Sequence, residues 1–230
     1  MTAEPIRIFV GSDIYNIKAE MALRWSILKH TSSPVDFRIM SRFNGDPIWR
    51  DWSHTDKWAT CFSCYRWIIP AVCNFKGKAI YLDSDMVVLA DIKGLFDSDV
   101  SKGAATTPKR ESSVMVFDCG RFANMPEFQL NTLKKEAVKT GDYYKLIKSR
   151  DMVTFIDQQW NCLDGDGFSR EKTKLIHYTD LPTQPWHPAP HRFNYKPHPH
   201  KEVSDIWRQY FEETFEHPEL MRHGHVPSAN

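Results

Sequence analysis

Two aspartates, Asp83 and Asp85, stand between two apolar runs in the stretch KAIYLDSDMVVLADI, residues 78–92. Burying a carboxylate is unfavourable unless a cation or hydrogen-bond donors meet it. Carboxylates at positions i and i+2 of an extended backbone converge on one cation, and a hard cation such as Mg²⁺ or Mn²⁺ also bridges the oxygens of a diphosphate. The stretch therefore predicts either a metal site or a covalent nucleophile with its partner acid.

Other interpretations of these aspartates stay open at this point. The simplest is a turn with solvated side chains. A calcium loop is disfavoured, because Val87 occupies the third ligand position and no glycine follows it. YLDSDMVV also resembles the first motif of haloacid-dehalogenase-like phosphatases, in which Asp83 would be the nucleophile. That motif usually lies on the first strand of its fold, whereas a β-α-β pattern precedes it here, and LDGDG at residues 163–167 is a weak match to a later acidic motif.

The elements around the acid pair predict an α/β fold. Ile6–Val10 reads as a buried strand that breaks at Gly11, residues 14–32 have helical periodicity, and a second strand begins at Val35. This β-α-β opening implies a parallel pair with a crossover helix. Residues 78–83 form an unbroken apolar strand, typical of the centre of a sheet. Ligands bind at the carboxyl ends of strands in open α/β sheets, so the acid pair is expected on that rim.

The rest of the chain extends the same pattern. A second helix is expected over residues 54–72, capped by Thr55 or Asp56. Further expected elements are strands near 103–108, 112–118 and 173–178, mainly helical structure over 126–148, a proline-rich loop over about 179–200 and a closing helix over about 204–216. We therefore expect a single domain, residues 1–230, built on a mixed, mostly parallel sheet.

Composition narrows the classes of function. The formal net charge is +1 and no lysine-rich run stands out, which argues against bulk nucleic-acid binding. No apolar run approaches the length of a membrane span, although a peripheral contact with the inner face of a membrane stays open. An odd count of five cysteines and no signal peptide favour reduced thiols in the cytoplasm. The Cys61–Cys64 spacing stands alone, so a redox or metal role there is disfavoured.

Four segments in order resemble the family 8 glycosyltransferases. They are IRIFVGSDIYN, FSCYRWIIPAVCNFKGKAIYLDSDMVVLADI, SSVMVFDCGRF and KLIHYTDLPTQPWHP, and together they cover most of residues 6–188. The resemblance implies a GT-A fold, a Rossmann-like nucleotide-diphospho-sugar transferase fold. It also implies a UDP-sugar donor, retention of anomeric configuration through same-face attack, and Mn²⁺ as the metal, with Mg²⁺ as the alternative.

The resemblance also implies roles for individual residues. Asp83, Asp85 and His177 would hold the metal, and the imidazole nitrogen suits Mn²⁺ better than Mg²⁺. Outside this motif, His177 would more often be a hydrogen-bonded core histidine. The residues implied to bind the donor are Ser12, Asp13, Tyr15, Arg66, Ser84, Gln184 and Trp186. A structural salt bridge is the alternative for Arg66, and a helix N-cap is the alternative for Ser12 or Asp13.

The chain departs from the family pattern at three places. Gln184 stands where the family has a lysine that grips the diphosphate, and Glu111 stands where it has an asparagine. Asp157 and Gln158 stand for the family's catalytic Asp-Gln pair, but the residues around them match the family only loosely, and a polar surface loop is the alternative. These departures keep a non-catalytic sugar-nucleotide-binding module open beside the transferase and the phosphatase. The acceptor is expected to be a glycan, a lipid-linked molecule or a small molecule.

Overall fold

A computed structural model describes residues 4–50, 60–109, 112–135, 140–187, 194–221 and 226–227. Its strands are β1 (Ile6–Gly11), β2 (Val35–Met40), β3 (Lys78–Asp83), β4 (Met86–Val88), β5 (Ala104–Thr106), β6 (Val114–Asp118), β7 (Val153–Phe155), β8 (Cys162–Leu163), β9 (Leu175–His177) and β10 (Val226–Pro227). Its α-helices are α1 (Ile17–His30), α2 (Pro47–Arg50), α3 (Ile69–Val72), α4 (Lys93–Phe96), α5 (Leu130–Lys135), α6 (Thr140–Ser149) and α7 (Lys201–Glu213). Short 3₁₀ turns join several of them, among them η2 (Tyr65–Ile68), η5 (Gln158–Trp160) and η6 (Leu181–Thr183).

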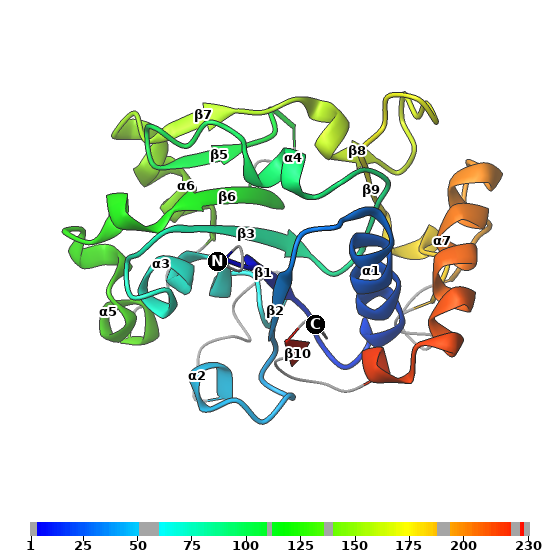
Figure 1. Cartoon of the computed structure of the whole chain (residues 1–230), viewed down its shortest axis with the longest axis horizontal. Coiled ribbons are helices and arrows are strands. Elements are labelled where there is room, and N and C mark those ends of the chain that lie inside the picture. Colours follow the sequence, from blue (N-terminus) through cyan, green and yellow to red (C-terminus); the bar gives the residue numbers. More distant parts are fainter. Residues whose placement is uncertain are drawn as a thin grey trace.

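The central sheet has the strand order β10-β2-β1-β3-β6-β5-β7 (Figure 1). β1 pairs in parallel with β2 and β3, and β5 pairs in parallel with β7. Only β6 and β10 run against the others among the described strands, because β6 is antiparallel to both β3 and β5 and β10 is antiparallel to β2. The expected mixed, mostly parallel sheet is therefore confirmed, with β3 at its centre.

Alternating residues of the central strands pack into two separate hydrophobic cores, one on each face of the sheet. Phe9, Tyr81 and Phe117 pack on one face against η2, α3, α5 and α6. Val10 and Leu82 belong to the other face, which packs against α1 and α4. Successive side chains of a strand point to opposite faces of the sheet. Because the side chains on both faces are apolar, helices pack against both faces of this sheet.

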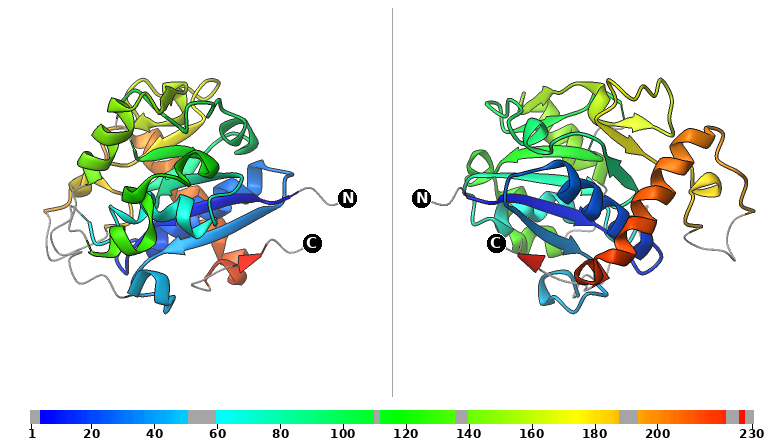
Figure 2. Two further views of the ribbon diagram at one scale, coloured as in Figure 1. Left: turned by 90° about the vertical axis from the view of Figure 1, so that its left-hand side faces the viewer. Right: turned by 45° about the vertical axis from the view of Figure 1, so that its right-hand side comes forward.

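A third apolar cluster ties the end of the chain to its beginning. Ala19 and Ala22 on α1 meet Val203, Ile206 and other residues of α7. The two helices lie side by side, with α1 packed on one face of the central sheet (Figures 1 and 2). None of the described helices combines the length and the apolar character that crossing a membrane requires.

A small second sheet, of order β4-β9-β8, was not expected from the sequence. After β3 ends at Asp83 the chain turns through Ser84 and Asp85 and re-enters extended structure as β4. β4 pairs antiparallel with β9, and Met86 lies opposite His177. The acid pair therefore sits where the chain passes from one sheet to the other.

The helix expected over residues 54–72 is wrong in its described part. Thr55 and Asp56 lie outside the described residues. From residue 60 the chain forms turns, then η2, and becomes α-helical only at α3. Pro70 has no N–H to donate to the Arg66 carbonyl, and Ile69 N–H bonds to that oxygen in a tighter 3₁₀ turn instead. The closing helix α7 begins at Lys201 and passes into a 3₁₀ turn at Thr214–Glu216, close to the expected bounds.

Candidate metal and ligand site

Strand pairing brings His177 to the acid pair. The backbone N–H of Tyr178 donates to the carbonyl of Asp85 at 2.9 Å, next to the Met86–His177 pair. One ligand atom from each of Asp83, Asp85 and His177 lies within 4.8 Å of the others. The site is thus built by a register between two short strands that are far apart in the sequence.

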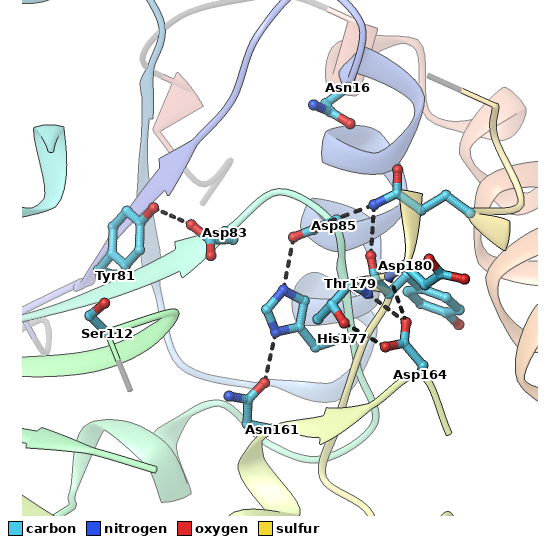
Figure 3. A network of polar contacts seen from close by, with 12 residues as sticks. Asn16, Tyr81, Asp83, Asp85, Ser112, Asn161, Asp164, His177, Thr179 and Asp180 are labelled. Atoms are coloured by element: carbon cyan, nitrogen blue, oxygen red, sulfur yellow. Dashed lines mark hydrogen bonds and ion pairs between the residues drawn. The ribbon is translucent and has the colours of Figure 1, made fainter. Parts of the chain in front are cut away.

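The imidazole of His177 is held in one orientation by Asn161 (Figure 3). Asn161 is fully buried, and its amide nitrogen donates to the Thr107 hydroxyl at 3.0 Å and to the Lys109 carbonyl at 3.3 Å. Its oxygen is therefore left to accept from His177 Nδ1, 2.8 Å away. This assigns the proton of a neutral imidazole to Nδ1 and turns the lone pair of Nε2 outward.

That lone pair faces a carboxylate. His177 Nε2 lies 3.2 Å from Asp85 Oδ1, and this oxygen is buried and accepts no hydrogen bond from the described residues. Two facing lone pairs at this distance repel unless a proton or a cation lies with them. An oxygen and a nitrogen donor turned toward each other, with a second carboxylate beside them, fit a divalent cation such as Mn²⁺.

Asp83 is tied to the protein through one oxygen. Arg66 Nη2 lies 3.0 Å from Asp83 Oδ1, and the Tyr81 hydroxyl donates to the same oxygen. Arg66 is 5% exposed, and its Nε also donates to the Ser63 carbonyl at 2.7 Å. Burial is the largest single influence and lowers the pKa of Arg66, but Asp83 and, to a smaller extent, Tyr81, Cys64 and Asp85 together hold this pKa above its ordinary value. The structural salt bridge considered for Arg66 is therefore present, and a contact with a donor sugar stays a prediction.

A cavity of about 460 Å³, called the main cavity below, opens beside these groups. Of the predicted residues, Arg66, Ser84 and Gln184 line it together with the three candidate metal ligands. The remaining lining residues were not singled out from the sequence: Asn16, Thr60, Phe62, Ser63, Ser112, Ser113, Thr179 and Leu181. Hydroxyl and amide groups thus make up most of its polar wall.

Four predicted donor-binding residues do not line the main cavity. Ser12 is buried and its hydroxyl has no hydrogen-bond partner among the described residues, while Tyr15 is exposed. Asp13 lines a smaller cavity of about 130 Å³, and burial raises the pKa of its carboxyl. Trp186 is buried, and its indole N–H donates to Asn16 Oδ1 at 3.1 Å. Their role in binding a donor stays a prediction.

The N-cap considered for Ser12 or Asp13 is wrong. α1 begins at Ile17, so Asn16 is the N-cap residue, and its side chain makes no capping bond. A turn at residues 14–15 separates β1 from the helix. Asp13 instead accepts hydrogen bonds from Tyr15 N–H and the Asn16 amide, both at 2.9 Å, which shapes this turn.

Asp157 and Gln158 lie outside the lining of the main cavity. The Asp157 carboxylate accepts from Gln159 N–H at 3.0 Å and lies 3.3 Å from Lys174 Nζ. The Gln158 amide bonds to Lys109 N–H at 2.9 Å and to the Asn161 carbonyl at 2.8 Å. These contacts brace the segment that carries Asn161, and a catalytic role for the pair stays a prediction. Glu111 lies outside the described residues.

Sequence reasoning missed two supports of the site. Asn161 carries no motif, and only its place close after Gln158 drew attention to that segment. Asp164 was noted only as part of a weak phosphatase match. Its carboxylate accepts from the N–H groups of Thr179 and Asp180 at 2.6 and 3.0 Å, which fixes the chain just after β9 (Figure 3).

Comparison with known proteins shows the fold. No protein-family model matches the chain. Protein CDI of Arabidopsis thaliana is 29% identical over 210 residues, spanning 76% of this chain and 78% of that protein. Among solved structures, galactosyltransferase LgtC, in complex with donor and acceptor sugar analogues, matches with a TM-score of 0.63 and 11% identity, covering 90% of this chain and 96% of its own.

Two further glycosyltransferase structures agree. GlyE of Streptococcus pneumoniae has a TM-score of 0.62 at 16% identity, covering 99% of this chain and 66% of its own. The bifunctional glycosyltransferase WbbM has a TM-score of 0.62 at 15% identity over 96% of this chain, and this chain spans about half of it, 52%. The chain therefore has the fold of the GT-A-type glycosyltransferases.

Proposed function

We propose that residues 1–230 form a single glycosyltransferase domain of the family 8 type. It transfers a sugar from a UDP-sugar, with retention of configuration, to a glycan, lipid-linked or small-molecule acceptor. The observation that carries the proposal is the Asp83–Asp85–His177 cluster at the wall of the main cavity in a GT-A fold. The closeness of His177 to the acid pair is the arrangement that the sequence motifs imply.

Asp83, Asp85 and His177 are the residues that would hold Mn²⁺, with Mg²⁺ as the alternative. The bound cation would neutralise the charge that grows on the diphosphate as the bond to the sugar breaks. Asn161 keeps the Nδ1 proton of His177 in place, which leaves Nε2 free to act as a ligand. Arg66 and Tyr81 hold Oδ1 of Asp83 and so fix how this carboxylate is presented.

Charge in the main cavity favours a metal-bound ligand over a bare phosphate. Asp83 and Asp85 line it, and among its described lining residues Arg66 is the one lysine or arginine. The Arg66 guanidinium is already committed to Asp83 and to the carbonyls of Ser63 and Ser112. A diphosphate entering alone would meet net negative charge, so we expect nucleotide binding to depend on the cation.

Retention through same-face attack asks for positioning and charge stabilisation more than for a protein acid or base. Ser84, Ser112 and Ser113 line the main cavity and offer hydroxyl groups that can orient a bound sugar. Asp157 and Gln158 remain proposed catalytic residues, and the mechanism does not require them in the position they occupy here.

The two other hypotheses fare differently. A phosphatase nucleophile at Asp83 is disfavoured, because Oδ1 of that carboxylate accepts from both Arg66 and Tyr81 and the residue ends the third strand, not the first, of a GT-A fold. A non-catalytic sugar-nucleotide-binding module is favoured by one observation, the position of Asp157 and Gln158 outside the main cavity. It therefore stays as the second candidate.

Release of UDP from a panel of UDP-sugars, with Mn²⁺ and with a chelator, tests the proposal. We expect release in Mn²⁺, loss in the chelator and loss in Asp85→Asn. Asp205→Asn is the matched control, since Asp205 is an exposed carboxylate on α7 that pairs with Lys201. Metal-independent UDP binding that is unchanged in Asp85→Asn would count against the transferase, and tight binding without release for any sugar would support the binding module.

A further inference from the structure

Gln184 connects the two halves of the candidate metal site. It follows η6, lines the main cavity and is 1% exposed. Its amide nitrogen lies 2.7 Å from the Tyr178 carbonyl and 3.3 Å from Asp85 Oδ2. Tyr178 directly follows His177 in the chain, so one side chain reaches the carboxylate of one candidate ligand and the backbone beside another.

The orientation of this amide follows from its partners. Both neighbours, a carbonyl and a carboxylate oxygen, can only accept, so the NH₂ group must face them. The two N–H bonds of Gln184 are then used within the protein. Oε1 is left buried and has no hydrogen-bond partner among the described residues.

This arrangement places a partner beside each carboxylate oxygen of Asp85. Gln184 donates to Oδ2, while Oδ1 faces His177 Nε2 at 3.2 Å. A carboxylate on a free side-chain torsion would rotate to relieve two facing lone pairs, and a donor on its other oxygen opposes that rotation. The group most able to keep Oδ1 turned toward His177 is thus the amide of Gln184.

We propose that Gln184 is a positioning residue that aims Asp85 at the bound cation, and that it is not a phosphate ligand. The second part follows from hydrogen-bond chemistry, because the amide hydrogens are already used and an ionised phosphate oxygen has no hydrogen to give to Oε1. The inference rests on the proposed metal site and assigns Gln184 a different task from the donor contact that the sequence suggests.

The test measures Mn²⁺ alone, without nucleotide, by the loss of the free Mn²⁺ electron paramagnetic resonance signal on titration with full-length protein. Gln184→Met keeps the length of the side chain but donates no hydrogen bond, and we expect its Kd for Mn²⁺ to rise at least ~10-fold, as for other groups that orient metal ligands. Gln129→Met is the matched control. The Gln129 amide also bonds two backbone carbonyls, those of Ala123 and Met125, but it lies outside the main cavity lining, so its Mn²⁺ affinity should equal that of the wild type.

Gln184→Lys tests the second part of the proposal, that this position does not hold phosphate. An ammonium group can donate to both oxygens, which preserves the contacts of the fold, but its charge pairs with Asp85 and competes with the cation. We expect at least ~10-fold weaker Mn²⁺ binding in this variant also. The unfolding temperature of each variant without metal shows that any loss of affinity is not loss of fold.

The outcomes separate this inference from the proposed function. Wild-type binding of Mn²⁺ with weakened binding in folded Gln184→Met supports the positioning role, and UDP binding that is no tighter in Gln184→Lys supports the absence of a phosphate contact. Wild-type affinity in folded Gln184→Met, or tighter UDP binding with unchanged Mn²⁺ affinity in Gln184→Lys, overturns it and leaves the metal site standing. No Mn²⁺ binding by the wild-type protein overturns both.

Discussion

Replacing Asn161 separates the orientation of His177 from the presence of its imidazole. In Asn161→Ala the acceptor 2.8 Å from His177 Nδ1 is lost, and the ring is free to take the other tautomer or to turn. Loss of a group that orients a metal-bound histidine typically weakens metal binding by about 10–100-fold, which is ~1.4–2.7 kcal/mol. The Asn161 amide also bonds Thr107 and Lys109 in a fully buried position, so we expect the variant to be less stable by roughly 1–3 kcal/mol as well.

Asn161→Asp is the matched variant, because an ionised carboxylate still accepts from His177 Nδ1 but no longer donates to Thr107. It should lose stability while keeping Mn²⁺ affinity close to that of the wild type. The pair of variants thus distinguishes support of the fold from support of the histidine.

Thermal unfolding with and without Mn²⁺ measures both the stability of each variant and its affinity for Mn²⁺. At a metal concentration of about 100 times Kd, binding stabilises the folded state by ~2.7 kcal/mol, and tenfold weaker binding reduces this to ~1.4 kcal/mol. The rise in Tm caused by Mn²⁺ should therefore fall to about half or less in Asn161→Ala and stay near the wild-type value in Asn161→Asp. An equal rise in all three proteins would refute the reasoning.

Two further predictions concern the scaffold. Gly11→Ala places a Cβ 2.6 Å from the Tyr81 hydroxyl, which donates to Asp83, so we expect roughly 1–3 kcal/mol of destabilisation in urea and weaker Mn²⁺ binding; wild-type values for both would contradict the packing described here. At Glu213, burial raises the pKa of the carboxyl, but hydrogen bonds from Lys29, Trp25 and Gln209 and the charge of Lys29 together hold it below its ordinary 4.5. Because the folded-state pKa is the lower one, this stabilisation is present above pH 4.5 and is lost as the pH falls through the folded value. In urea titrations at several pH values, the free energy of unfolding of Glu213→Gln should therefore fall less in acid than that of the wild type. The difference should stay below ~1 kcal/mol, because Lys29 and Glu213 form a partly exposed pair. The same pH profile in both proteins would contradict this prediction.

The sequence predicted the frame of the molecule because its signals are local. Long apolar strands such as β1 and β3 and the periodic helix α1 need no tertiary information. The strand at β9 was expected, but the second sheet was missed, since its other strands, β4 and β8, are only three and two residues long and too short to carry a period. The interruption of the helix before Pro70 was missed because the apolar residues of this segment are spaced as in a continuous α-helix.

The candidate site divides in the same way. Asp83, Asp85 and His177 could be grouped through motifs, although no local feature says that β4 pairs with β9 in the register that joins them. Asn161 acts through a side chain of another strand, and its partners exist only in the folded chain. Asp157 and Gln158 lie outside the lining of the main cavity because of how η5 packs, and a match of two residues in the sequence gives no information about that packing.

A crystal of the full chain soaked with Mn²⁺ and UDP, and measured at the manganese absorption edge, tests the central claim most directly. The account predicts one anomalous peak bonded to Asp83, Asp85 and His177 Nε2, with the diphosphate on its open side. A peak elsewhere, or bound UDP with no manganese between the diphosphate and these three side chains, would contradict it.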